Sequence, residues 1–174
     1  MVNINEKFLI DSNTFITAAR QFYSYDIIPT FWEKFDQEII NGNIVLLDLV
    51  LDELNEGEDL LKNWIHERRE KFVGCKHKDK KVIEMYAKVM QFINECGFYN
   101  DKGLACWAEE KIADPWIIAA AKAYDYTIVT FEVPASGLGE NQKIGKVKIP
   151  DVAKYFKIEV INLYEMMRRL ELKI

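Results

Sequence analysis

Short runs of consecutive apolar residues alternate with stretches whose apolar residues recur at helical spacing. The runs Lys7–Ile10 (KFLI), Ile44–Leu47 (IVLL) and Thr127–Phe131 (TIVTF) have the length of strands. The continuous apolar run Ile44–Leu47 is typical of a strand buried on both faces. The segment Glu159–Ile161 is predicted to be extended, and Lys146–Ile149 to be a further short strand. Strands that alternate with helices predict an α/β fold with three layers, α/β/α, around a central, mostly parallel sheet.

Helix-boundary residues define the segments between these strands. Pro29 suits the first turn of a helix, and Asp114 before Pro115 is a favoured helix start, because Asp is a preferred N-cap and Pro fits the first helical position. The basic and polar stretch 73–80 (VGCKHKDK) is interpreted as a link. The predicted helices cover Asn13–Tyr23, Pro29–Ile40, Asp48–Gly57, Asp59–Phe72, Lys80–Glu95, Lys102–Lys111, Asp114–Tyr124, Asp151–Phe156 and Asn162–Leu170, and Pro134–Lys146 is predicted to be a mobile loop.

Composition narrows the class of protein. The 174 residues are 49% hydrophobic and include only 8 Gly and 4 Pro, which excludes a disordered or collagen-like chain and predicts a single domain over residues 1–174. Three cysteines without a CxxC pair indicate a reducing compartment. The first residues lack the apolar segment of a signal peptide, and the apolar stretch Ile44–Leu51 is far shorter than the roughly 20 residues of a membrane span. We therefore expect a cytoplasmic protein without a membrane anchor.

Charge is distributed unevenly along the chain. The whole sequence has a net charge of −5, whereas the segment Lys62–Lys88 contains nine basic and four acidic residues and is therefore +5. A basic stripe on an otherwise acidic protein favours an anionic partner. Arg68 and Arg69 in this stripe, and Lys143 and Lys146 in the loop after residue 132, are the candidates for contacts with phosphates. The alternative, a pair of solvated helices, is equally compatible with the pattern.

Four acidic residues follow strands or open helices at comparable places. Asp11 directly follows the first strand, Glu132 follows the strand 127–131, Glu53 lies in the short helix after the second strand, and Asp114 starts its own helix. Residues just past the carboxyl ends of parallel strands converge on one crevice, which is where ligands bind in open α/β sheets. The sequence therefore predicts that the four carboxylates meet.

Carboxylates gathered in one place repel one another, so they either take up protons or hold a divalent cation. Oxygen ligands without His or Cys suit Mg²⁺ or Mn²⁺, and such an ion can activate water and neutralise a phosphodiester under attack. Each acid alone also has an ordinary structural interpretation as a helix cap, and Asp48 is better explained in that way. The coincidence of the four positions favours the metal site, with Glu56 as an accessory candidate.

The motifs around these acids resemble those of PIN-domain ribonucleases. The resemblance rests on FLIDSNTFI (8–16), LVLDEL (49–54) and ADPWIIAAAKAYDYTIVTFE (113–132), and it extends over about residues 7–161. The tail VKIPDVAKYFKIEVINLYEMMRRL (147–170) further resembles a PIN-like subfamily of the DUF4411 type, which is often encoded as a toxin component.

The resemblance carries expectations for the site and its partners. It implies that Asp11, Glu53, Asp114 and Glu132 bind Mg²⁺ or Mn²⁺ and that the chain cleaves RNA endonucleolytically. Asn13 and Thr130 would be polar supports that hydrogen-bond a ligand or a metal-bound water. Toxin-type members are usually paired with an antitoxin protein and often form homodimers. The chain differs from the family pattern in its fourth acid, a Glu where Asp is commoner, and in a longer, more basic stretch over 55–110.

Other functions fit the sequence less well. A phosphatase of the haloacid-dehalogenase type needs a second acid two residues after the first, where Asn13 stands. A zinc site at Cys75 and His77 lacks recognised ligand spacing, and a flap-type DNA nuclease usually has more acids and a helical arch. The non-enzymatic alternative is a catalytically silent PIN-like scaffold that binds RNA or a protein. Phe15, Phe22, Tyr23 and Tyr25 are candidates for a dimer or antitoxin surface, although at least half of them are expected in the core.

Overall fold

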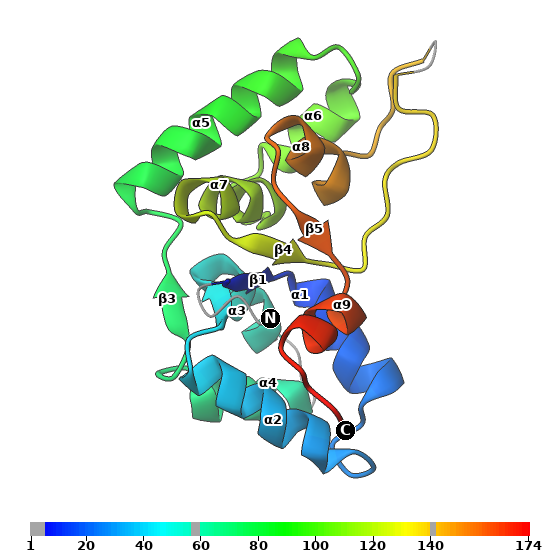
Figure 1. Ribbon diagram of the computed structural model, residues 1–174. Coiled ribbons are helices and arrows are strands. Elements are labelled where there is room, and N and C mark those ends of the chain that lie inside the picture. Colours follow the sequence, from blue (N-terminus) through cyan, green and yellow to red (C-terminus); the bar gives the residue numbers. More distant parts are fainter. Residues whose placement is uncertain (1–5, 57–59, 140–141) are drawn as a thin grey trace.

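The computed structural model describes residues 6–56, 60–139 and 142–174 of the chain. Within these residues, five parallel strands form one sheet in the order β3-β2-β1-β4-β5 (Figure 1). The strands are β1 (Phe8–Ile10), β2 (Ile44–Leu47), β3 (Val73–Cys75), β4 (Thr127–Val129) and β5 (Val160–Ile161).

The sheet has a topological switch point between β1 and β4. The chain adds β2 and then β3 on one side of β1, and it returns to add β4 and β5 on the other side. β1 and β4 pair in register from Phe8 opposite Thr127 to Ile10 opposite Val129, so these strands end side by side. Such a switch point leaves a crevice at the carboxyl ends of the strands.

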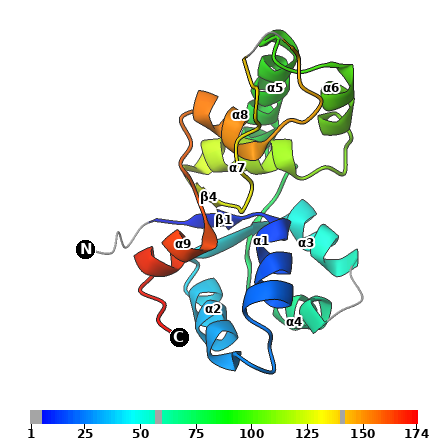
Figure 2. The ribbon, with the colours of Figure 1, turned by 90° about the vertical axis from the view of Figure 1, so that its right-hand side faces the viewer.

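Helices cover both faces of the sheet, which confirms the predicted three-layer α/β/α fold. Helices α5 to α8 lie on one face, α1, α2, α4 and α9 lie on the other, and α3 lies beside the carboxyl ends of the strands (Figures 1 and 2). The helices are α1 (Ser12–Thr17), the π-helical segment η1 (Ala18–Phe22), α2 (Pro29–Ile40), α3 (Asp48–Glu56), α4 (Leu60–Arg68), α5 (Lys80–Glu95), α6 (Asp101–Trp107), α7 (Asp114–Tyr124), α8 (Ile149–Tyr155) and α9 (Leu163–Arg169).

The hydrophobic pattern explains why these elements pack. Every residue of β1 and β2 is buried, as expected for strands with helices on both faces. Helix α7 buries the continuous stretch Ile117–Ala121, whose small alanines let the helix lie close to the sheet and to α5. On the other face, α2 buries Phe31, Trp32, Phe35 and Ile39, which recur at helical spacing.

Two predicted elements are wrong. Residues 73–80 were expected to be a link, but Val73–Cys75 form the edge strand β3, paired with β2 from Val45 opposite Val73. Residues 146–149 were expected to be a strand; instead Lys148 is the N-cap of α8, which begins at Ile149 with Pro150 in its first turn. Helix α4 also ends four residues earlier than predicted, at Arg68. The predicted helix boundaries at Gly57 and Asp59 lie outside the described residues.

The first aromatic residues lie mainly in the core. Phe15 and Tyr23 are buried, Tyr25 is partly buried, and Phe22 is exposed. Phe15 and Tyr23 therefore do not form a partner surface. None of the helices in the described ranges combines the length and apolar character that crossing a membrane requires.

Candidate active site

Asp11 is buried at the switch point of the sheet. It follows β1 in extended conformation, its backbone N–H donates to the carbonyl of Val129 at 3.0 Å, and only 2% of the residue is exposed. The Thr130 hydroxyl donates to Oδ2 of Asp11 at 2.9 Å and accepts the backbone N–H of Glu132 at 3.0 Å. Thr130 therefore fixes the Asp11 carboxylate and the start of the next segment together.

Burial raises the pKa of Asp11 to about 6. The hydrogen bond from Thr130 opposes this rise, whereas the negative charges of Glu132 and Glu53 add to it. A smaller lowering of the pKa comes from the Asn13 backbone amide, which is directed at the carboxylate without making a capping hydrogen bond. A dry carboxyl group surrounded by other acids is the environment that favours either a proton or a cation.

Asp114 opens α7 but does not cap it. Ala113 occupies the N-cap position and no side chain makes a capping hydrogen bond, so the predicted N-cap role of Asp114 is wrong. Burial, together with the charges of Asp11, Glu132 and Glu53, raises the pKa of Asp114 to about 7. The carboxylate is thus left for the crevice rather than used by its own helix.

Glu132 belongs to the same cluster but is bound on both oxygens. Its Oε1 forms an ion pair with Nζ of Lys148, and its Oε2 accepts the Ile149 backbone N–H at 3.0 Å. Glu132 therefore caps the start of α8 with its side chain. The ion pair raises the pKa of Lys148, and the charges of Asp114 and Asp11 contribute to that rise.

The structure thus places the four acids predicted from the sequence close enough for their charges to interact. Asp11 and Asp114 each respond to the charges of Glu53 and Glu132, although the four residues come from three segments and α3. Glu53 is partly exposed on α3, and Glu56 on the next turn is exposed. Lys148 is the charged residue of this cluster that sequence reasoning missed.

The donor chemistry of the cluster fits Mg²⁺ or Mn²⁺. Within the described residues, no three Asp, Glu, His or Cys side chains converge as a ready-made metal cage. Mg²⁺ does not require one, because it keeps several waters and binds proteins through one or two carboxylates. Asp11 and Asp114 could supply such ligands. A divalent cation would offset the cost of burying the two charged carboxylates and the repulsion between the acids, which are the causes of the raised pKa values.

The remaining predicted site residues differ in their exposure and in the partners they already have. Asn13 is exposed and contributes its backbone amide, as described above. Arg68 donates to Asp36 at 2.8 Å and lies over the ring of Trp64 at 4.5 Å, so it is committed to packing. Arg69 is mostly exposed and lies 3.5 Å from Asp52, the neighbour of Glu53. Lys143 and Lys146 are exposed on the segment that leads to Lys148.

The cysteine and histidine of the predicted link are used structurally. His77 lies 2.8 Å from Oδ2 of Asp48 through Nδ1, and its backbone N–H donates to Oδ1 of Asp48 at 2.9 Å. Cys75 is buried, and burial raises the pKa of its thiol to about 12. Because the thiolate is the form that binds metal, a buried thiol that keeps its proton is a poor zinc ligand.

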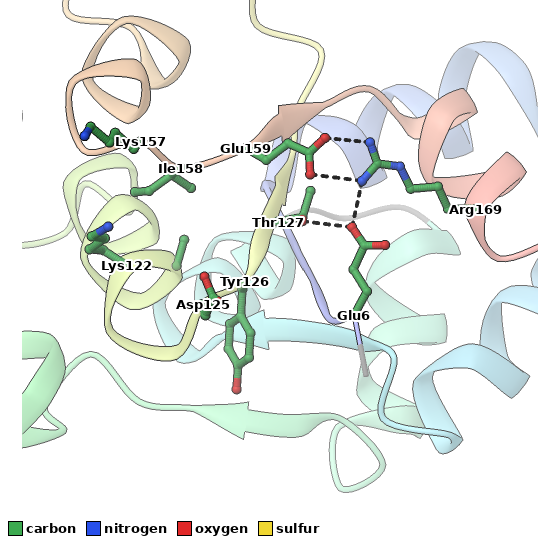
Figure 3. Close-up of a pocket in the computed structure, with 10 residues that line it drawn as sticks. Glu6, Lys122, Asp125, Tyr126, Thr127, Lys157, Ile158, Glu159 and Arg169 are labelled. Carbon is green, nitrogen blue, oxygen red and sulfur yellow. Dashed lines mark hydrogen bonds and ion pairs between the residues drawn. The ribbon is translucent and has the colours of Figure 1, made fainter. Parts of the chain in front are cut away.

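Two hollows lie at opposite ends of the strands. A groove of about 660 Å³ adjoins the acids and is lined by Thr130, Phe131, Glu132, Asn162 and Arg168, among others. A polar cavity of about 510 Å³ lies at the other end, where β1, β4 and β5 begin, and in it Arg169 binds both Glu6 and Glu159 (Figure 3). The charges of Glu6, Glu159 and Arg169 are therefore already paired with one another inside the protein.

Three solved structures contain a chain with the same fold. The chain is similar to one in VapBC2 from Rickettsia felis bound to a DNA fragment from their promoter (TM-score 0.53, 13% identity, covering 89% of this chain and 97% of that one). It is also similar to chains of DNA-bound VapBC from Salmonella typhimurium (0.52, 15%, 90% and 98%) and of FitAcB from Neisseria gonorrhoeae (0.53, 20%, 90% and 98%). At these identities the similarity establishes the fold.

The sequence itself matches one family. No curated protein sequence is similar enough to this chain to count as a relative. Residues 8–174 match the family model described as "Domain of unknown function (DUF4411)", which is nearly the whole chain. The chain therefore belongs to the DUF4411 family, and its fold is PIN-like.

Proposed function

We propose that this chain, acting as a single PIN-like domain over residues 1–174, is a metal-dependent endoribonuclease that hydrolyses RNA phosphodiester bonds. One observation carries the proposal: Asp11 and Asp114 lie in one crevice at the switch point, and burial and the charges of the surrounding acids raise the pKa values of both. Strongly perturbed carboxyl groups in a crevice are typical of catalytic sites. The PIN-like fold supports the choice of nucleic acid as substrate.

In the proposed mechanism, Asp11, Asp114 and Glu53 would hold Mg²⁺ or Mn²⁺, and Glu132 completes the acidic crevice. A bound ion would supply an activated water and neutralise charge on the phosphodiester. Thr130 holds the Asp11 carboxylate in one orientation through its hydroxyl. Lys148 offers a positive charge to the same crevice. No covalent bond between the protein and the RNA is required, because water is the nucleophile.

The groove beside the acids supports a single-stranded substrate. It shares Thr130 and Glu132 with the acid cluster and continues past Phe131 to Asn162 and Arg168. The Arg168 side chain is 73% exposed, so it is accessible to a phosphate. Contacts of this kind give affinity without reading the sequence of the RNA, and Arg69, Lys143 and Lys146 remain further candidates.

The first prediction tests the acids directly. Asp11→Asn and Asp114→Asn should each reduce Mn²⁺-dependent cleavage of a panel of tRNA, rRNA and mRNA by at least about 100-fold, because the ion loses a charged ligand. Chelation with EDTA should abolish wild-type cleavage. Asp125→Asn is a matched control at the other end of α7, where the backbone is left-handed (φ 58°) and Asn fits as well as Asp. Full activity of both site variants would remove the acids from the mechanism.

A catalytically silent scaffold that binds RNA or a protein is the second candidate. The ion pair between Glu132 and Lys148 favours it to a limited degree, because it neutralises one of the four acids internally. Mn²⁺ titration separates the two candidates: a scaffold would show no binding that depends on Asp11 and Asp114.

The partners are also proposed from similarity. The similar chains were crystallised in assemblies named VapBC2, VapBC and FitAcB, and toxin-type PIN proteins are usually paired with an antitoxin. We therefore propose that this chain is the toxin component of such a pair, with an antitoxin protein as its partner in the cytoplasm and a homodimer as its own assembly. Co-expression with the product of the neighbouring gene, followed by size-exclusion chromatography, tests both associations.

A further inference from the structure

Lys148 places a fixed positive charge inside the acid cluster. Its Nζ is paired with Glu132, and its charge also acts on Asp114 and Asp11. The lysine stands between Val147 and Ile149, both of which are buried, and Ile149 opens α8. Because the backbone on both sides is anchored in the core, Lys148 is not a freely moving surface lysine.

Glu132 is in turn unavailable as a simple metal ligand. Both carboxylate oxygens are engaged, Oε1 by Lys148 and Oε2 by the Ile149 backbone N–H. The side chain of Glu132 is only 14% exposed and that of Lys148 is 32% exposed, so water screens the pair weakly. Binding a cation through Glu132 would require breaking a charge-assisted hydrogen bond and uncapping α8.

A second divalent ion would meet the ammonium group directly. Two-metal nucleases hold their ions about 3.5–4 Å apart and share carboxylates between them. Here the carboxylate that a second ion would need, that of Glu132, is already paired with the Lys148 ammonium group. A second ion at this place would be repelled by that ammonium group and would lack a free carboxylate.

We propose that Lys148 takes the place of a second metal ion, so that the site binds one divalent cation, beside Asp11, Asp114 and Glu53, while Lys148 and Glu132 form a fixed pair. This inference rests on the proposed function, because it assumes that the acids hold a metal ion. An ammonium group has three donors, and Glu132 takes one of them among the contacts described. The remaining donors would be available to a phosphate oxygen of the substrate.

Counting bound Mn²⁺ tests the inference without measuring activity. The full chain is titrated with MnCl₂ at pH 8, and binding is followed by calorimetry and by the electron paramagnetic resonance signal of free Mn²⁺. The wild type should bind one ion. Lys148→Met should bind two, because the Glu132 carboxylate becomes available and the competing charge is gone. Lys148→Arg keeps the charge and should still bind one.

Two further variants examine Glu132 without depending on Lys148→Met alone. Glu132→Gln leaves Lys148 without its partner, so the lysine should compete for Asp11 and Asp114 and weaken Mn²⁺ binding about tenfold. In the double variant Glu132→Gln, Lys148→Met, this competition is absent, and affinity should return to within about threefold of the wild type. Circular dichroism and thermal melting establish that each variant is folded.

The possible failures are distinguishable. Two ions of similar affinity in the wild type overturn the role of Lys148 and leave the proposed nuclease intact. One ion in Lys148→Met, or loss of Mn²⁺ binding in the double variant, also overturns it, because Lys148 would then not exclude an ion or Glu132 would be a ligand. Absence of any Mn²⁺ binding to the wild type overturns the metal-dependent function itself.

Discussion

The two buried aspartates carry an electrostatic cost that depends on pH. The pKa of Asp11 is raised to about 6 and that of Asp114 to about 7, against an ordinary value of 3.8. The folded protein therefore retains protons that the unfolded chain releases above pH 4. Stability from these groups is fully present below pH 4 and is lost as pH rises through 6 and 7.

We therefore expect Asp11→Asn to stabilise the metal-free protein at neutral and alkaline pH. A rise of about two pKa units corresponds to about 2–3 kcal/mol, so the melting temperature in EDTA at pH 8 should increase by about 5 °C. The increase should shrink towards zero near pH 4, where Asp11 is protonated in both states. Differential scanning fluorimetry between pH 4 and pH 8 measures this.

Asp125→Asn provides the comparison for that series, since Asp125 is exposed at the end of α7. Its melting temperature should follow the wild type at every pH. Added Mn²⁺ should raise the melting temperature of the wild type at pH 8 more than that of Asp11→Asn, because an ion that binds only the folded state stabilises it. A constant difference between Asp11→Asn and wild type at all pH values would contradict the raised pKa.

Single acids at strand ends could be predicted from the sequence, but their partners could not. Asp11 and Glu132 follow apolar runs that are visible in one pass, and the parallel-sheet rule brings them together. Lys148 escaped because it lies in a segment interpreted as a strand. A signal did exist: a lysine two residues before the Pro-Asp pair of a helix start is unfavourable for the helix dipole, and it therefore indicates an acidic partner elsewhere.

At the scale of elements, one carboxylate ties the turn after β3 to the start of α3. Asp48 begins α3 directly after β2, and its Oδ1 accepts the backbone N–H groups of Leu49 at 3.0 Å and of His77 at 2.9 Å. The other oxygen lies 2.8 Å from Nδ1 of His77. The residue that follows β2 therefore holds the turn that follows β3.

Replacing Asp48 should loosen this edge. Asp48→Ala removes an acceptor from two backbone donors and one ring nitrogen, so the free energy of unfolding should fall by about 1–3 kcal/mol. Hydrogen exchange of the amides in β3 should accelerate relative to those in β1. Urea denaturation and exchange mass spectrometry give both values.

Asp52→Ala is the matched control on the same helix. The Asp52 side chain is 63% exposed and its ion pair to Arg69 spans 3.5 Å, so its removal should change stability by less than about 0.5 kcal/mol. Equal effects of the two substitutions would show that the Asp48 contacts add nothing beyond helix charge.

Long periodic elements were predicted well, and short ones were not. The apolar runs of β1, β2 and β4 and the patterns of α2, α5 and α7 are strong local signals. The strand β3 contains three residues, one of them Gly74, and is followed by polar residues, so its local propensity for a strand is low. It forms because β2 presents an unpaired edge, and this is tertiary information.

At the scale of the whole molecule, strand order decides which chain ends meet. The composition and the alternation of elements predict a parallel sheet but do not give the order β3-β2-β1-β4-β5, because pairing of β1 with β4 joins residues more than 100 positions apart. That pairing produces both ends of the molecule: the acids at the carboxyl ends of the strands and a charged cavity at the amino ends.

Ion pairs that line the charged cavity connect the C-terminal helix α9 to the sheet. Arg169 of α9 binds both carboxylate oxygens of Glu159, just before β5, at 2.6 and 3.0 Å, and Oε1 of Glu6, just before β1, at 2.7 Å (Figure 3). Thr127 at the start of β4 donates to the same Glu6 oxygen at 3.1 Å. One guanidinium group thus links three strands and the last helix.

Arg169→Gln should therefore destabilise the protein by about 1–3 kcal/mol, because Glu6 and Glu159 lose a charged partner that is only partly screened by water. The arginine holds the pKa of Glu159 below its ordinary value of 4.5, so this contribution is present above pH 4.5 and is lost as pH falls through the folded-state value. Urea denaturation at pH 7 and pH 3 should show the difference shrinking in acid.

Arg168→Gln, at a neighbouring residue whose side chain is 73% exposed, is the control and should have little effect on stability. Mn²⁺ affinity should stay unchanged in both variants, and a loss of affinity in Arg169→Gln would mean that the two ends of the sheet are coupled.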